Sequence, residues 1–323
     1  MNNKHFIFID ILRVLGILLI LNFHLDMTFP SKMSILSFGG DLGNDIFFML
    51  SGFSISVSID DSKWYDFGKW YIRRFFKIFP IVFVFLIIPL LSGYYTINSI
   101  TEFIVYFIFP MFYWYIGAII IFYFFVFIVE KMNRKLLVFL VIIGVAIHII
   151  RNGMFEERYI IGFFAMVVGC ELRRFFMKGE KRIKNKRSIW IGLFCSLITF
   201  GLLKFLMKMY FLNSRILHLL IGIIIIVICA LLIIVGYVSE DRLIVFFDNN
   251  RFGYFILKNI SMSTLYIYLL HQVDRRALFF YFSSHVAFPI SYTLCMVYAI
   301  LGGITLMRIE KVIRKRLLCL LKR

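Results

Sequence analysis

Long apolar runs separated by short polar segments recur along the whole 323-residue chain. A helix needs about 18 or more apolar residues to cross roughly 30 Å of hydrocarbon. On this criterion the pattern predicts ten spans, at residues 6–26, 43–61, 78–98, 112–130, 136–151, 158–175, 188–208, 215–237, 255–273 and 286–307. We therefore expect an all-α polytopic membrane protein, a bundle of about ten transmembrane helices in a single domain over residues 1–323.

The composition agrees with a membrane protein and excludes an ordinary soluble domain. Hydrophobic residues make up 62% of the chain, whereas soluble domains contain about 45–50% apolar residues. The first span lacks a cleavage site of small residues after a short apolar core, so we expect it to be a retained anchor and not a signal peptide. The lipid bilayer is thus the first predicted partner.

The formal net charge of +18 indicates topology and not nucleic-acid binding. Of the 36 lysines and arginines, 27 lie at the N-terminus and in alternate connecting segments, namely 63–77, 131–135, 173–187, 239–258 and 308–323. Cytoplasmic loops carry such an excess of positive charge. We therefore expect both termini in the cytoplasm, the basic tail 308–323 as an interfacial helix on an anionic leaflet, and no nucleic-acid partner.

The cysteines give no sign of a metal site. Five cysteines occur without CxxC spacing, and all of them lie in or beside apolar runs. We expect reduced packing residues, with neither a disulfide framework nor a metal.

Three ionisable residues interrupt the first span: Asp10, Arg13 and His24. His24 lies eleven positions after Arg13, which is about three helical turns and about 16 Å along the axis, so both side chains share a face. Asp10 and Arg13 are spaced to form an i, i+3 ion pair. Ionisable groups inside a membrane usually face a cavity or pathway.

This stripe of charges favours chemistry at two ends of one helix. A neutral imidazole, with an ordinary pKa of about 6.5, can take a proton from a hydroxyl. Arginine can bind phosphate through two parallel hydrogen bonds. The stripe thus fits a base near the outer end, at His24, and an anion clamp toward the cytoplasm, at Arg13. Snorkelling of Arg13 and an interfacial role for His24 are the structural alternatives.

Three stretches of sequence together resemble the acyltransferase-3 family of integral membrane acyltransferases. They are DILRVLGILLILNFH (10–24), GGDLGNDIFFMLSGF (39–53) and YIRRFFKIFP (71–80). The resemblance implies a ten-helix bundle in the plasma or inner membrane that moves an acyl group, usually acetyl from acetyl-CoA, to a hydroxyl of a carbohydrate, often a cell-surface polysaccharide. Acetyl-CoA or another acyl-CoA is then a co-substrate, with no bound cofactor, and polysaccharide assembly proteins are candidate partners.

The resemblance also assigns roles to single residues. Arg13 and His24 match the first family motif, and Ser51 begins the Ser-Gly-Phe element. Arg74 and Lys77 match an Arg-x-x-Arg element, which implies donor binding together with Arg13. Lysine in the second position keeps the charge but loses the bidentate fork of arginine, so we expect looser phosphate binding there.

Further candidates support these residues. Asp45 and Asp10 are acids near the outer and inner ends of the stripe. We expect Asp45 to orient the imidazole of His24; Asp41 is the other candidate, with a solvated loop position as its alternative. Trp114 begins the fourth span, where an aromatic membrane belt is the alternative.

The stretch STLYIYLLHQ (263–272) resembles a late family element and makes Tyr268 and His271 candidates for the acceptor site, with interface anchoring as the alternative. His5, His148 and His285 receive no function.

Two other functions compete with the acyltransferase. A transporter or flippase-like protein could use Asp10, Arg13 and His24 as a relay without coenzyme A. The third hypothesis is a scaffold of a polysaccharide assembly complex that has no catalytic activity.

Overall fold

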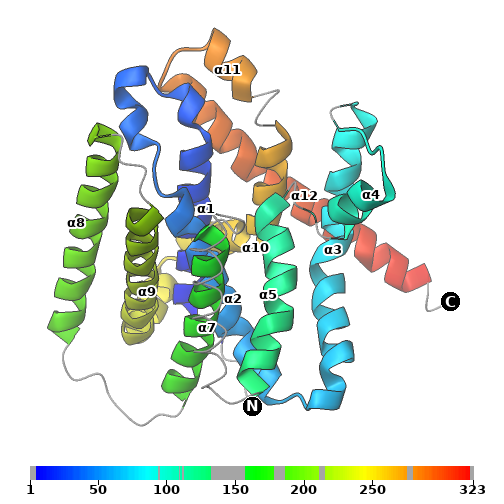
Figure 1. The fold of residues 1–323 in the computed structure, drawn as a ribbon, viewed down its shortest axis with the longest axis horizontal. Helices are drawn as coiled ribbons and strands as arrows, with labels where there is room; N and C mark the ends of the chain where they lie inside the picture. Colours follow the sequence, from blue (N-terminus) through cyan, green and yellow to red (C-terminus); the bar gives the residue numbers. More distant parts are fainter. Residues whose placement is uncertain are drawn as a thin grey trace. The chain divides into compact units, whose positions relative to one another are not determined.

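The computed structural model describes residues 5–93, 95–108, 110, 113–131, 157–177, 186–210, 215–274 and 279–320. Every regular element in these residues is helical, which confirms the all-α class for the described chain. The α-helices are α1 (Ile7–His24), α2 (Gly40–Asp60), α3 (Phe67–Leu91), α4 (Ile100–Phe107), α5 (Trp114–Lys131), α7 (Glu157–Met177), α8 (Lys186–Tyr210), α9 (Arg215–Asn249), α10 (Arg251–Asp274), α11 (Phe280–His285) and α12 (Ile290–Leu320) (Figure 1). Short 3₁₀ helices are η1 (Asp26–Thr28), η2 (Ser31–Leu36) and η3 (Trp64–Asp66).

Nine of the predicted spans coincide with one of these helices, and the remaining one, 136–151, lies outside the described residues. Within the described chain, seven helices are long and apolar enough to cross a membrane. Helices α7 and α10 are not among the seven, although they contain 21 and 24 residues. The total of ten spans and the orientation of the termini therefore stay predictions.

The chain divides into two compact units. Unit 1 comprises Met1–Gly43, Ile87–Tyr94 and Ser239–Arg323, and unit 2 comprises Asn44–Leu86 and Tyr95–Val238. The interpretation of residues 1–323 as one functional domain is not tested by this division and stays a prediction.

In unit 1, helix α1 packs against α10, and the two run parallel. Near the start of α1, Asp10 pairs with Ser261, and at its end His24 lies beside Gln272. Residue numbers thus rise together along both helices. Parallel packing is what the predicted first and ninth spans require, because both are odd-numbered in an alternating series.

Helix α12 runs antiparallel to α10, as the predicted tenth span should. The Tyr266 hydroxyl contacts Glu310 near one end of the pair, and Leu270 meets Gly302 toward the other. Helix α12 continues for 31 residues without a break (Figure 1). Residues 308–320 of the basic tail are therefore an extension of the same helix, and the position of the tail on a leaflet stays a prediction.

In unit 2, α2, α5 and α7 run parallel to one another, with α5 and α7 side by side (Figure 1). Trp114 at the start of α5 meets Tyr159 at the start of α7, and Glu130 at the end of α5 pairs with Arg174 at the end of α7. Arg174 also pairs with Asp60 at the end of α2, with 2.6 Å between Nη2 and Oδ1. The second, fourth and sixth predicted spans thus share one direction.

Glycines bring α2 and α7 into backbone contact. A Cβ at Gly52 would collide with the carbonyl oxygen of Met166, and one at Gly169 would collide with that of Met49. The Cys170 thiol donates to the carbonyl of Gly52 at 3.2 Å. Small residues allow such close approach in membrane proteins. The glycine of the Ser-Gly-Phe element is therefore explained by packing.

Helix α3 corrects one detail of the sequence interpretation. The third span was predicted to begin at residue 78, but α3 begins at Phe67 and continues through Pro80 and Pro89. Proline removes one backbone hydrogen bond and crowds the carbonyl group four residues before it, and membrane helices tolerate both effects where neighbours compensate. Arg74 and Lys77 consequently lie one turn apart within a regular helix.

Candidate active site

The C-terminal ends of α1 and α10 bring two histidines together in unit 1. The ring centroids of His24 and His271 are 4.9 Å apart, and the ring of Tyr268 lies 5.4 Å from that of His271. The side-chain nitrogen of Gln272 is 3.4 Å from Nε2 of His24. The predicted residues His24, Tyr268 and His271 are therefore neighbours, although they come from opposite ends of the chain.

Burial and hydrogen bonding orient these rings. His271 is fully buried and Tyr268 is 4% exposed, whereas His24 is half-buried. Nδ1 of His271 lies 3.2 Å from the carbonyl oxygen of Ile267. Because a carbonyl oxygen only accepts, this nitrogen carries hydrogen, and Nε2 is the acceptor of the neutral ring. Full burial does not suit an interfacial anchor, which keeps a polar tip in water.

Asp10 forms a second polar cluster of unit 1, near the start of α1. Its carboxylate accepts hydrogen bonds from Ser261 at 2.5 Å and from His5 at 2.7 Å, and the residue is 1% exposed. Arg13 lies 4.0 Å away, at the limit of an ion pair. The predicted Asp10–Arg13 pair thus exists, but the closer partners of the carboxylate are Ser261 and His5.

The carboxylate of Glu240 caps the N-terminal end of α1. It accepts hydrogen bonds from the backbone N–H groups of Ile7 at 2.7 Å and Phe8 at 3.1 Å. These are donors that a helix N-terminus leaves without partners in its own turns, and a carboxylate is favourable there. The Arg13 side chain is 36% exposed. Arg13 therefore keeps an accessible guanidinium beside a fixed helix end.

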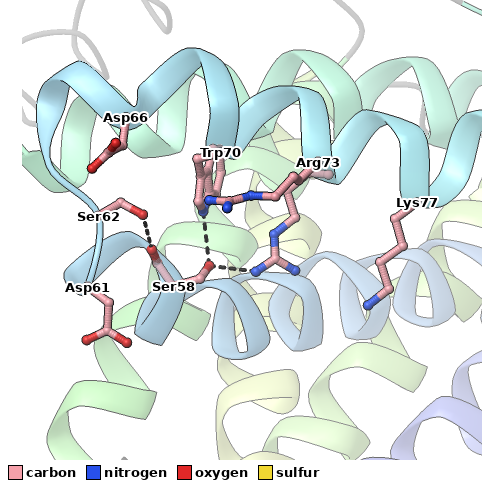
Figure 2. A pocket seen from close by; sticks show the side chains of 8 residues that line it. Ser58, Asp61, Ser62, Asp66, Trp70, Arg73 and Lys77 are labelled. Atoms are coloured by element: carbon pink, nitrogen blue, oxygen red, sulfur yellow. Dashed lines mark hydrogen bonds between the residues drawn. The ribbon is translucent and has the colours of Figure 1, made fainter.

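A cavity of about 560 Å³ lies in unit 2, where the end of α2 meets the first turns of α3 (Figure 2). Eight residues line it: Ser58, Asp61, Ser62, Asp66, Trp70, Arg73, Arg74 and Lys77. The lining therefore contains three cations, two carboxylates and two hydroxyls. A cleft of this size and character suits a polar ligand that carries phosphate groups.

Arg74 is the half-buried cation of this pocket, whereas Arg73 and Lys77 are exposed. Nη2 of Arg74 donates to the hydroxyl of Ser58 at 2.6 Å, and its guanidinium lies 5.9 Å from the centre of the Trp70 ring. Figure 2 shows Arg73 and Lys77 along the same stretch of α3. The predicted donor residues Arg74 and Lys77 thus share one cavity, and their role in binding stays a prediction.

The other predicted site residues of unit 2 lie outside this cavity. Asp45 is 5% exposed in the early part of α2, and Ser51 is half-buried farther along the same helix. Trp114, at the start of α5, lies 4.4 Å below the guanidinium of Arg158. The prediction that Asp45 orients His24 joins residues of different units and stays a prediction.

Sequence reasoning missed several members of both sites. In unit 1 it gave His5 no function and did not select Gln272. In unit 2 it did not select Ser58 or Arg73. Arg73 stands beside the Arg-x-x-Arg position, so the run of basic residues was a usable signal. Ser58 offered none, because a helical serine usually bonds its own preceding turn.

The comparison with protein families identifies the chain. A family model described as an acyltransferase domain, that of the acyltransferase-3 family, matches residues 6–308. Comparisons with curated proteins and with solved structures found no match. The matched range includes every residue of both polar sites described above except His5, and the chain belongs to the acyltransferase-3 family of membrane acyltransferases.

Proposed function

We propose that the protein transfers an acyl group, acetyl in the first instance, from cytoplasmic acyl-CoA to a hydroxyl of a cell-surface or lipid-linked glycan. Membrane acyltransferase activity follows from the family. The donor, the acceptor and the location in the plasma or inner membrane are the proposed parts. The observation that carries the donor assignment is the cavity lined by Arg73, Arg74 and Lys77.

The cavity suits the nucleotide end of coenzyme A for electrostatic reasons. Coenzyme A carries a diphosphate and a ribose phosphate, and guanidinium groups bind such anions through charge-assisted hydrogen bonds. Three cations line the cavity, and its volume of about 560 Å³ falls within the usual range for small-molecule sites. Asp61 and Asp66 add acceptors for amino or hydroxyl groups of a ligand.

His24 is the proposed general base. An imidazole nitrogen takes the proton of the acceptor hydroxyl, the hydroxyl oxygen bonds to the acyl carbon, and the thioester C–S bond breaks as the coenzyme A thiolate leaves. Nε2 of His24 faces the side-chain amide of Gln272, and an amide NH₂ group only donates. Nε2 therefore carries the lone pair of the neutral ring, and it must exchange its contact with Gln272 for the acceptor hydroxyl before it can take the proton. Transient acylation of His24 is the alternative route, in which this nitrogen attacks the thioester first.

The deciding experiment measures transfer of labelled acetyl from acetyl-CoA to glycan by the full-length protein in lipid vesicles. Replacing Arg74 and Lys77 together with Gln should weaken acetyl-CoA binding at least tenfold, because two charged donors to phosphate are lost. The matched control replaces Lys63 and Lys69, two exposed lysines of the same segment that do not line the cavity. Both double variants lose two positive charges on one side of the membrane.

The outcomes separate the competing functions. If only the Arg74 and Lys77 variant binds acetyl-CoA more weakly, the result supports the donor site. If both variants bind it equally weakly, the effect comes from the loss of positive charge in general and not from the cavity. If glycan crosses the vesicle membrane without acetyl-CoA, the result would support the transporter hypothesis. If the purified protein binds acetyl-CoA but transfers no acetyl to any glycan of the native envelope, the result would support the scaffold hypothesis.

A further inference from the structure

The hydroxyl of Ser58 is at the centre of three hydrogen bonds beside the cavity. It donates to the backbone carbonyl of Ile55 at 2.7 Å. It accepts from Nε1 of Trp70 at 3.0 Å and from Nη2 of Arg74 at 2.6 Å. Figure 2 shows the last two bonds converging on one oxygen from two successive turns of α3. A serine hydroxyl has one proton and two lone pairs, so its bonding capacity is filled.

The chemistry of the partners fixes the direction of each bond. An indole N–H and a guanidinium N–H can only donate. The hydroxyl must therefore accept from both Trp70 and Arg74, and its own proton is directed to the only acceptor of the three, the carbonyl of Ile55. Trp70 is 2% exposed, so its N–H has little access to water as a substitute partner. Ser58 thus joins the end of α2 to α3 in one defined arrangement.

This arrangement holds Arg74 in one position. A free arginine side chain has many rotamers, and restricting them on binding costs conformational entropy. Ser58 takes one N–H of the five that a guanidinium offers, and the indole ring lies 5.9 Å from the guanidinium carbon. The remaining N–H groups stay available to a ligand. An arginine that is held before binding loses less entropy when a phosphate arrives.

We propose that Ser58 is a positioning residue for donor binding, which acts through Arg74 and raises the affinity of the cavity for the phosphate groups of acyl-CoA. This inference rests on the proposed donor site. A purely structural role in joining α2 to α3 would affect the amount of folded protein, whereas a positioning role affects the affinity for coenzyme A of the protein that is folded.

The test measures the dissociation constants of acetyl-CoA and coenzyme A for purified full-length protein in nanodiscs. Ser58→Ala should raise both constants about tenfold, whereas Ser58→Thr, which keeps the hydroxyl, should stay within about twofold of wild type. Ser58→Cys keeps the volume but replaces a good acceptor with a weak one, so it should resemble Ser58→Ala even if the alanine variant folds poorly. Ser54→Ala is the matched control, because the Ser54 hydroxyl of the same helix donates to the carbonyl of Leu50.

A double-mutant cycle tests whether Ser58 acts through Arg74. If it does, Ser58→Ala should add less than about twofold to the dissociation constant of an Arg74→Gln variant, because the group that it positions is already gone. Full additivity of the two changes would overturn the inference. Unchanged binding by Ser58→Cys beside a weakened Arg74→Gln would also overturn it and leave the donor site intact, whereas unchanged binding by Arg74→Gln would overturn the donor site itself.

Discussion

The imidazole rings of His24 and His271 lie 4.9 Å apart between centroids, at an interplanar angle of 41°. They come from two parallel helices, α1 and α10, and both stand at or near the C-terminal end of their helix. A half-buried histidine that contacts a fully buried one has a fixed environment on one side and an accessible edge on the other. This geometry suits a base whose ring must not rotate freely.

Replacement of His24 by Ala or Gln should reduce glycan acylation at least 100-fold, because a positioned general base contributes about 10² to 10⁴ to a rate. His24→Gln is the sharper variant, since it keeps hydrogen-bonding capacity but cannot take a proton at neutral pH. The measurement is NMR of acetyl groups on the surface glycan of a deletion strain complemented with each variant.

The amount of protein in the membrane is the control for these variants. His24 is half-buried at the end of α1, so we expect normal insertion and abundance for both. A His24→Gln protein of normal abundance that acylates the glycan at a near wild-type rate would show that His24 is not the base.

His271→Phe should lower activity by about tenfold or more while the protein stays folded. Phenylalanine fills the same buried space next to His24 and Tyr268 but has no ring nitrogen, so packing is kept and hydrogen bonding is lost. The rate of acetyl transfer at saturating acetyl-CoA is the quantity to compare. If His271→Phe transfers acetyl at the wild-type rate, the role of His271 is confined to packing.

Much of the fold could be predicted because membrane helices leave a strong signal. Runs of about 20 apolar residues are uncommon elsewhere, and alternating positive charge gives a direction for each run. The parallel course of α1 and α10 and the antiparallel course of α12 agree with that alternation. Helix boundaries were less predictable, since α3 starts eleven residues before the predicted span. Residues 67–77 form an amphipathic extension of α3 in which nine of the eleven positions are charged or aromatic, as is typical of a membrane interface.

The candidate site could be predicted only in part, for a different reason. Spacing along one helix placed Arg13 and His24 on one face, but periodicity does not say which distant helix covers that face. Ser261 and Gln272 were therefore not distinguishable from other polar residues of α10. The Asp10 carboxylate shows the consequence, because its nearest partners are Ser261 and His5 and not the expected Arg13.

Ser261→Ala should lower the free energy of unfolding by about 1–3 kcal/mol, because it removes a hydrogen bond to a buried carboxylate. Ser263→Ala is the matched control: Ser263 is fully buried in the same helix, but its hydroxyl donates to the carbonyl of Ile260 within α10. Thermal unfolding in detergent compares the two. If both variants lose the same free energy of unfolding, the hydrogen bond between Ser261 and Asp10 does not help to hold α1 against α10.

Cysteine labelling tests the orientation of the membrane spans. In a variant whose native cysteines are replaced by serine, an impermeant maleimide should reach Lys32→Cys in η2 only from outside and Gly68→Cys in α3 only from the cytoplasm. Both positions are exposed, and nothing lies within 4 Å of a Cβ added at Gly68. The opposite pattern would reverse the assignment of both termini.

Gly52→Ala should sharply reduce the amount of folded protein. The added methyl group would collide with the carbonyl oxygen of Met166, which is backbone and cannot move aside without shifting α7. Overpacking of this kind costs about 1–3 kcal/mol, and more where backbone must move. Glycine 201 gives the matched control, since nothing lies within 4 Å of a Cβ added there and the position is exposed on α8.

Gly201→Ala should be neutral or stabilising by up to about 1 kcal/mol, because alanine favours a helix more than glycine does. The measurement is the yield of monodisperse protein after extraction, followed by thermal unfolding. The comparison separates two explanations of the Ser-Gly-Phe element. If Gly52→Ala inserts and unfolds like wild type but loses acyl transfer, Gly52 serves the reaction and not the packing of α2 on α7.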